Sequence, residues 1–258
     1  MKLTADFHTH TRFSHGKGSI LDNALVAKEL GLDSIGITDH GFSHIVMGLN
    51  SCKLGRYIKD CKEAQEKTGV KVLVGVESNI TSIEGDVDLS VDRYAQFDLF
   101  LAGIHKLIWY KWGSWFKFGI PTVLKSTFKC ENASNELIKN TTKAVVEAVK
   151  KNPIDVITHL NYCSYLDPVE VAKVCADYGT YVELNAKKIH LTDEKLYEVC
   201  KTGVRFVINS DAHSPKRVGE ISLVEQLLQR VEVPVDRIDN IDGKMPSFRF
   251  KAFKEKSL

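Results

Sequence analysis

Two histidines near the start of the chain have the type and spacing of metal ligands. His8 and His10 are separated by one residue and follow a short apolar run that is typical of a β-strand. On an extended strand, side chains two positions apart point to the same side. Two such imidazoles would form part of a metal site, and His15 on the following segment would add a third nitrogen. The pair alone is weak evidence, because surface histidines also pair by chance.

More ligand-type residues occur where other apolar, strand-like runs end. These ends carry Thr38-Asp39-His40, Gly75-Val76-Glu77, His105, His159 and Ser210-Asp211-Ala212-His213. In parallel α/β barrels, catalytic groups lie at the carboxyl ends of the strands. Seven of the nine histidines are therefore expected on one rim, and only His44 and His190 are expected elsewhere.

Each of these residues also has an ordinary structural explanation. Glu77 could cap a turn or pair with a lysine, and His159 could be a hydrogen-bonded core histidine. Asp39 and Asp211 precede histidines and could be helix N-caps. These explanations would have to hold independently at nine positions, so the sequence favours a metal site.

Seven apolar segments are expected to be the strands that position these residues. They are Leu3–His8, Asp33–Thr38, Lys71–Glu77, Asp98–Gly103, Ile154–Thr158, Thr180–Leu184 and Arg205–Asn209. Most are nearly continuous in apolar residues, as strands covered on both faces are. Helical segments lie between them, and four of these stop before Gly31, Gly69, Gly179 or Gly203, a residue type that suits the left-handed end of a helix. Repeated βα units imply parallel strands, and seven units indicate a closed or nearly closed barrel.

Two helix starts are marked by capping residues. Asp167 is expected to be an N-cap, with Pro168 in the first turn and Glu170 at the capping-box position. Ser19 and Asp22 give the first helix a similar start.

The composition is that of an ordinary enzyme domain. A chain of 258 residues without a Ser/Pro-rich linker fits one domain, residues 1–258. A net charge of +2 does not by itself indicate nucleic acid. No apolar run approaches membrane-spanning length, the first residues do not resemble a signal peptide, and we expect no membrane partner. Six scattered cysteines favour free thiols and a cytoplasmic location.

Two regions interrupt the βα pattern. An insertion at about 106–130 holds all three tryptophans, several other aromatic residues and five lysines, but no acidic residue. It is expected to be a lid over the site or a dimer contact, or alternatively a platform that stacks the bases of a single strand. From Val233 onward, the chain is expected to be irregular and to end in a solvated, lysine-rich tail.

The motifs together resemble the PHP (polymerase and histidinol phosphatase) superfamily. The resemblance covers nearly the whole chain and rests on His8-x-His10, Ile37-Thr38-Asp39-His40, Gly75-Val76-Glu77, His105, His159 and Asp211-Ala212-His213, in family order. It implies a distorted (β/α)7 barrel with a trinuclear metal centre at the carboxyl ends of the strands. His15 is a departure, because polymerase-fused members usually carry Asp at this spacing and phosphatases often carry His one residue later.

The resemblance also implies a ligand set. One cation would be held by His8, His10, Glu77 and Asp211, a second by Glu77, His105 and His159, and a third by His15, His40 and His213. Divalent transition metals are expected, with zinc favoured over manganese and iron. Glu77, Asp211 and His213 are the expected catalytic residues. Asp6 and Asp39 are expected to orient ligand histidines.

The leading functional hypothesis is a metal-dependent phosphoesterase that attacks a small phosphomonoester with a metal-bridging hydroxide. Arg12, Lys17 and Lys106 are adjacent to ligand positions and would bind phosphate oxygens, although each could equally be a solvated surface cation. The alternatives are a PHP-type nuclease acting on single-stranded nucleic acid, a histidinol phosphatase, and an inactive metal-bound module. The complete ligand set argues against the last of these.

Overall fold

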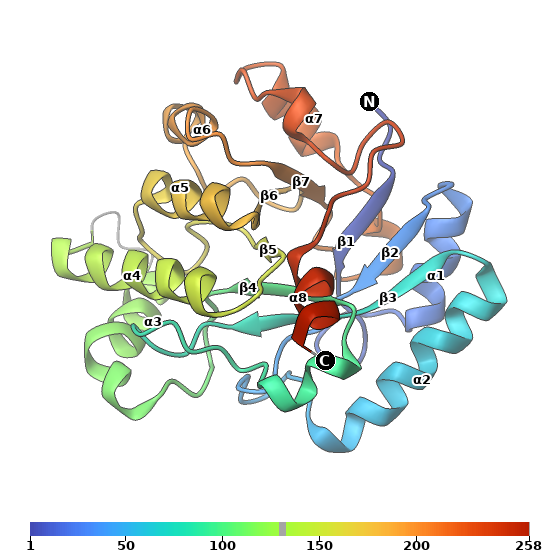
Figure 1. Ribbon diagram of the computed structural model, residues 1–258, viewed down its shortest axis with the longest axis horizontal. Coiled ribbons are helices and arrows are strands. Elements are labelled where there is room, and N and C mark those ends of the chain that lie inside the picture. Colours follow the sequence, from blue (N-terminus) through green and yellow to red (C-terminus); the bar gives the residue numbers. More distant parts are fainter. Residues whose placement is uncertain (129–132, 258) are drawn as a thin grey trace.

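A computed structural model describes residues 1–128 and 133–257 and shows seven parallel strands in a nearly closed barrel (Figure 1). Each strand pairs with the next along the chain, in the order β1 to β7. The strands are β1 (Ala5–Thr9), β2 (Ser34–Ile37), β3 (Lys71–Asn79), β4 (Leu99–Gly103), β5 (Val156–Ile157), β6 (Tyr181–Asn185) and β7 (Phe206–Asn209). All seven predicted strands are present, and the predicted fold class is confirmed.

The described helices are α1 (Ile20–Glu29), α2 (Ser51–Thr68), α3 (Ile120–Thr127), α4 (Asn135–Lys151), α5 (Pro168–Tyr178), α6 (Asp193–Cys200), α7 (Ser222–Leu228) and α8 (Arg249–Ser257). Most of them lie around the outside of the barrel, whereas α8 lies over one end of it (Figure 1). Ser19 and Asp22 form the predicted capping box, and Asp167 caps α5. Within the described residues, no helix is both long and apolar enough to cross a bilayer.

The interior of the barrel changes from apolar to polar along the strands. The apolar layer contains Ala5, Phe7, Leu99, Leu101, Val156, Tyr181 and Val207. Since side chains two apart on a strand share a face, Tyr181 on β6 is followed inside the barrel by Glu183 and Asn185. On β7, Val207 is followed in the same way by Asn209. The polar layer therefore lies at the carboxyl ends of the strands, directly below the predicted site.

A register shift in β1 explains how this strand serves both layers. Asp6 pairs with Ile35 and Thr9 with Ile37, so β1 has one more residue than β2 between these pairs. Such a bulge re-aims side chains and is common beside active sites. As a result, Phe7 joins the apolar interior while His8 contacts Glu183 of the polar layer.

The first strand closes the barrel against the segment that follows the last one. His10 N–H donates to the Ala212 carbonyl at 2.8 Å, next to a bridge between Thr9 and Ala212. Asp6 strengthens this closure, because its carboxylate accepts N–H groups of Ser210 (3.2 Å) and Gly219 (2.9 Å). None of the described hydrogen bonds of Asp6 comes from an imidazole. Asp6 therefore stabilises the closure of the barrel, and the expectation that it orients a ligand ring was wrong.

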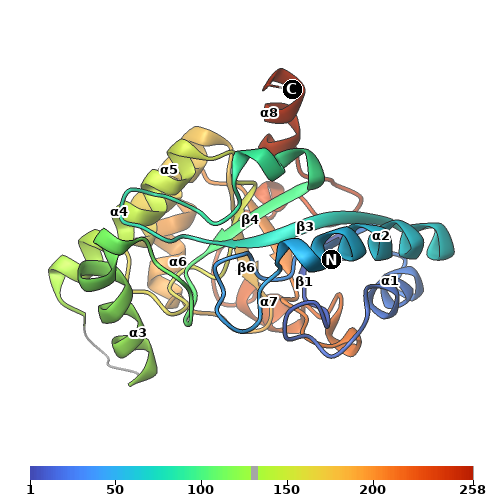
Figure 2. The same cartoon turned by 90° about the horizontal axis from the view of Figure 1, so that it is seen from below.

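The carboxyl-terminal region is more ordered than the sequence predicted. Asn240 donates to the carbonyls of Ala5 (2.8 Å) and Ile208 (2.6 Å) and accepts the Ile208 N–H. Helix α8 lies at the amino ends of the strands, on the opposite side of the molecule from α3 (Figure 2). Phe250 is fully buried there, and its N–H donates to the carboxylate of Asp155 at 2.8 Å. The expectation of an irregular, solvated tail was therefore wrong, because an apolar residue within the lysine-rich stretch fixes the helix to the barrel.

The insertion forms a continuous helical run that starts with a 3-10 turn (Trp112–Ser114) and a π turn (Trp115–Gly119) and continues as α3. Tyr110 and Phe118 are buried, whereas Trp109, Trp112 and Phe116 are exposed. Lys129 and Cys130, at the end of the predicted insertion, lie outside the described residues.

Candidate metal centre

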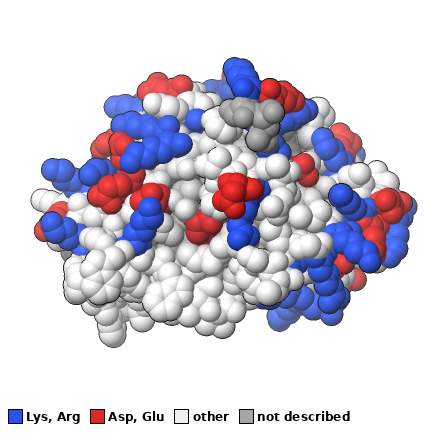
Figure 3. Space-filling model, turned by 60° about the horizontal axis from the view of Figure 1, so that its bottom comes forward, with Lys and Arg blue, Asp and Glu red and all other residues white. Residues whose placement is uncertain are grey.

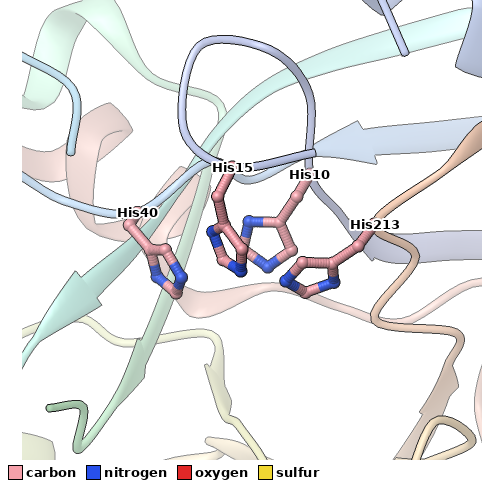
Figure 4. A group of neighbouring side chains, drawn as sticks. All are labelled: His10, His15, His40 and His213. Atoms are coloured by element: carbon pink, nitrogen blue, oxygen red, sulfur yellow. The ribbon is translucent and has the colours of Figure 1, made fainter. Parts of the chain in front are cut away.

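The predicted ligands converge at the carboxyl ends of the strands. Figure 4 shows four imidazoles pointing toward one another: His10 and His15 follow β1, His40 follows β2 and His213 follows β7. Three overlapping groups have ligand atoms within 4.8 Å of one another, and these are His10/His15/His40/His213, His8/His10/Asp211 and His40/Glu77/His105. The structure thus brings together residues that are far apart in the sequence.

Glu77 is the central residue of the cluster and is fully buried. Its Oε1 lies 3.0 Å from His105 Nε2, 2.8 Å from His159 Nε2 and 3.4 Å from His8 Nε2. Its Oε2 lies 3.0 Å from His40 Nδ1. The two carboxylate oxygens therefore face different histidines, which is the arrangement that a bridging ligand requires.

Three buried atoms of this cluster have no hydrogen-bond partner among the described residues: His40 Nδ1, His105 Nε2 and Glu77 Oε2. The two imidazole nitrogens each come within 3.0 Å of a Glu77 oxygen, but the orientation is not that of a hydrogen bond. A buried polar atom without a partner costs about 1–3 kcal/mol. Imidazole and carboxylate are ligands that divalent transition metals prefer. The unpartnered atoms therefore fit a site for such cations.

The electrostatics of the cluster indicate the same kind of ligand. Burial lowers the pKa of His8, but the negative charges of Glu77, Glu183 and Asp211 outweigh it and raise that pKa well above its usual value. Burial raises the pKa of Glu77, but His105 and His8 hold it well below its usual range. Three fully or almost fully buried carboxylates thus create a negative potential that favours bound cations.

Glu183 on β6 is a functional residue that the sequence reasoning missed. Its carboxylate accepts His8 Nδ1 at 2.7 Å and the His159 backbone N–H at 2.8 Å. The side-chain amides of Asn185 and Asn209 donate to it at 2.9 Å each. The hydrogen bond from His8 Nδ1 directs His8 Nε2 toward Glu77 and toward His10 Nε2, which lies 3.1 Å away. The hydrogen bond from the His159 N–H holds a residue whose φ of 27° is unusual for a residue with a side chain. The signal in the sequence was an acidic residue inside an otherwise apolar strand.

Two further supports lie around the cluster. His105 Nδ1 donates to Asn79 Oδ1 at 2.8 Å, which directs His105 Nε2 toward Glu77. Asp39 accepts the Thr11 N–H (2.8 Å), the Thr11 hydroxyl (2.6 Å) and the Ser14 N–H (3.1 Å). In the described hydrogen bonds, Asp39 therefore orders the loop between His10 and His15. It does not accept a hydrogen bond from a ligand ring, which differs from the expectation.

The cluster forms one side of a cavity of about 340 Å³. His44 and His190 also line it, so the expectation that these two lie elsewhere was wrong. His44 stacks on His40 with ring centroids 5.1 Å apart, and its Nδ1 accepts the Met47 N–H at 3.2 Å. Both residues belong to loops that fold over the rim, which the strand pattern could not reveal.

Three lysines line the cavity: Lys106, Lys187 and Lys188. Lys187 Nζ lies 3.0 Å from His213 Nδ1 and 3.4 Å from the carboxylate of Asp211. Two of the three follow β6, a strand end that the sequence reasoning had not connected with phosphate binding.

The other expected phosphate ligands lie differently. Arg12 and Lys17 are exposed and are absent from the described lining of the cavity. From the insertion, only Lys106 and Leu107 contribute to that lining. Trp109, Trp112 and Trp115 lie outside the lining of the cavity, so in this conformation the aromatic part of the insertion does not form the expected lid.

Comparisons with known proteins agree with this fold and site. The model of the PHP domain family matches residues 6–194. A protein named probable phosphatase from Thermoanaerobacter sp. (strain X514) is 28% identical over 267 residues, covering 96% of this chain and 95% of the relative. One of the same name from Shewanella sp. (strain ANA-3) is 28% identical over 258 residues, covering 93% and 88%.

The barrel also resembles a solved structure of histidinol phosphate phosphatase from Lactococcus lactis subsp. lactis Il1403, complexed with zinc, L-histidinol and phosphate. The TM-score is 0.61 at 16% identity, with 89% of this chain and 94% of the other covered. The chain belongs to the PHP family. Within that family it is a metal-dependent phosphatase, as the resemblance had implied.

Proposed function

We propose that this phosphatase hydrolyses a small phosphomonoester with three divalent transition-metal cations per chain, of which zinc is favoured. The observation that carries the proposal is the set of buried, unpartnered atoms on His40, Glu77 and His105. The ligand groups remain those given by the family resemblance, with Glu77 shared between two cations. When bound, the cations would supply an activated water and neutralise charge on the phosphoryl oxygens.

The protein's own residues are proposed to hold this arrangement and to bind the substrate. Glu183 fixes the ring of His8 so that Nε2 remains the ligand atom. Lys187 is close enough to Asp211 and His213 to pair with a phosphate oxygen once cations occupy the cluster. Lys106 and Lys188 add positive charge to the same wall.

The cavity favours a particular kind of substrate. Its volume of about 340 Å³ is at the small end of ligand sites, which argues for a small molecule over a nucleic acid strand. Apart from Glu77 and Asp211, its described lining contains no acidic side chain that could pair with an ammonium group. The organic part of the substrate is therefore proposed to be neutral or anionic, as in a sugar phosphate or nucleotide. Histidinol phosphate, which carries an amine, fits less well.

The remaining proposals concern the domain organisation and the cellular location. Residues 1–258 are proposed to form one domain, with an insertion at about 106–130. The free thiols among the described cysteines support a location in the cytoplasm.

The test combines elemental analysis with a substrate screen. The purified protein should contain two to three transition-metal ions per chain, and chelation should abolish activity. The screen should cover sugar phosphates, nucleotides, histidinol phosphate and short oligonucleotides, each also assayed with Glu77→Gln to exclude a contaminating phosphatase. Trace metal after metal-supplemented expression, or preferential cleavage of oligonucleotides, would overturn the proposal.

A further inference from the structure

The helical run of the insertion exposes an apolar stripe. Trp112, Phe116, Ile120, Leu124 and Phe128 follow one another at intervals of four residues. Their exposed fractions range from 39% for Ile120 to 85% for Trp112. Residues four apart on a helix lie on the same side, one above the other. We call these five residues the outer stripe.

The opposite side of the same run is also apolar and is packed against the molecule. Phe118 is fully buried, and its ring lies 5.3 Å from that of Tyr110. At Gly119, the backbone approaches the Tyr110 ring so closely that an added Cβ would meet it at 2.7 Å. The run is therefore already fixed to the barrel by its inner side. A helix that is apolar on both sides is typically buried on both sides.

The π turn keeps the outer stripe on one side. In a regular α-helix, a spacing of four residues drifts around the axis, because one turn takes only 3.6 residues. The π turn Trp115–Gly119 winds more slowly, since it closes i→i+5 hydrogen bonds, and this counteracts the drift. Phe116 therefore remains aligned with Leu124. Figure 3 shows a broad area without charged side chains on the lower part of one face, at the end of the molecule where Figure 2 places α3.

The size of this surface fits a protein interface. Trp109 (63% exposed) adds to this surface, because its ring lies 6.3 Å from that of Trp115 in the π turn, and Leu107 (51% exposed) lines the cavity. Since large side chains offer roughly 150–250 Å² each, these seven exposed fractions amount to roughly 800 Å², the area that each partner buries in a standard interface. The largest apolar patch of a typical monomer is only about 300–600 Å².

We propose that the outer stripe binds the outer stripe of a second copy of this chain, so that the protein is a two-fold dimer. A row of residues four apart forms a ridge, and two such ridges interdigitate when identical helices cross. A two-fold contact requires a self-complementary surface, and an uncharged apolar row meets this requirement. The flanking Lys111 is paired with Asp86 at 2.7 Å, so at least this lysine does not depend on an anionic partner for neutralisation.

The first test is the oligomeric state of charge variants. Sedimentation equilibrium of the metal-loaded protein should show a monomer–dimer equilibrium, and Trp112→Lys should weaken it about 30-fold or more, as loss of an aromatic anchor does. Val91→Lys is the matched control, because Val91 is 72% exposed on a different surface, and it should leave the equilibrium unchanged. A monomer at all concentrations up to about 100 μM, or equal dissociation constants for the two variants, would overturn the proposal.

Cross-linking tests the geometry without depending on a destabilising variant. In a two-fold packing, the middle of the outer stripe lies near its own symmetry mate, so Ile120→Cys should form an inter-chain disulfide on mild oxidation. The background should carry Cys52→Ser and Cys130→Ser, because Cys52 is exposed and Cys130 follows the run. Val91→Cys in the same background should remain monomeric on denaturing gels. Equal cross-linking of both cysteines would count against the contact.

Salt distinguishes a second copy from a lipid surface. Two copies bring the same lysine-flanked surface together, so screening should leave their association unchanged or strengthen it. Binding to an anionic bilayer should instead weaken as salt rises. Co-sedimentation with vesicles of 70% phosphatidylcholine and 30% phosphatidylserine at 50 and 500 mM NaCl gives the comparison. Salt-sensitive vesicle binding by a chain that remains monomeric would overturn the dimer.

Discussion

The two ends of the barrel bury carboxylates in opposite ways. At the carboxyl ends of the strands, Glu77 is surrounded by imidazoles that hold its pKa well below the usual range, although burial alone would raise it. At the amino ends, Asp155 is also fully buried, but it accepts only the N–H groups of Phe250 and Phe100 in its described hydrogen bonds. Burial raises the pKa of Asp155 to about 7, despite these hydrogen bonds and the charge of Arg249.

The difference separates a proposed cation site from a buried acid that has no such role. At the carboxyl ends of the strands, Glu77 faces unpartnered imidazole nitrogens, an arrangement that bound cations would satisfy. At the amino ends of the strands, the carboxylate of Asp155 accepts backbone N–H groups and can take up a proton near neutral pH. Burial of an acid is therefore not by itself a sign of a functional site, whereas convergence with unpartnered imidazoles is.

The largest effect is expected from Glu77→Gln. The variant removes charge shared between two proposed cation sites, so turnover should fall about 10²-fold or more, the scale of losing an electrostatic catalytic group. Metal content should fall with it, as measured by elemental analysis. Glu225→Gln, at an exposed position on α7, is the control. Activity within a few-fold of the parent protein would show that Glu77 is not a bridge.

Glu183→Gln should have the next largest effect. Because the amide is a weaker acceptor for His8 Nδ1, metal affinity should drop about 10–100-fold, the usual cost of removing a group that orients a ligand. Competition with a chelating dye measures this without reference to activity. Asp155→Asn, a buried acid at the opposite end, is the matched control and should leave metal affinity unchanged. Equal losses in both variants would indicate a general loss of stability.

Lys187→Met should affect substrate binding more than metal binding. Losing one charge-assisted contact to phosphate should raise KM about tenfold, with a smaller change in kcat. Lys17→Met tests the earlier expectation from the sequence, and its KM should change less than about twofold, because Lys17 is exposed and outside the described lining. A larger rise in KM for Lys17→Met than for Lys187→Met would indicate that the loop after β1 binds the phosphate.

A separate prediction concerns stability and not activity, and it is the pH dependence of unfolding in the metal-free protein. Between about pH 4 and pH 7, folded Asp155 keeps a proton that the unfolded chain has released, because its pKa is raised to about 7. Its contribution to the free energy of unfolding should therefore fall by about 1.4 kcal/mol per pH unit over this range and level off above it. Urea unfolding at several pH values should show this slope, and Asp155→Asn should flatten it. A parallel slope in the variant would assign the dependence to other groups.

The sequence predicted what depends on local patterns. Continuous apolar runs located the seven strands, because parallel strands covered on both faces leave little room for polar residues. It could not predict features that depend on tertiary contacts. Glu183 becomes important only through its distance to His8, and His44 enters the cavity only because its loop folds over His40. In the sequence, Phe250 is part of a charged tail, and its burial depends on the packing of α8 against the amino ends of the strands.

The contact between the first strand and the segment after the last one has a consequence for biosynthesis. The hydrogen bond between Asp6 and Ser210 joins residues 204 positions apart. At about 5–20 residues per second, roughly 10–40 s separate the synthesis of these two residues. Contacts between such distant segments also form late in folding, because a long loop must close first. At the proposed metal centre, His8 and His10 would therefore lack Asp211 until β7 has docked beside β1, and full affinity for a cation would be reached only then.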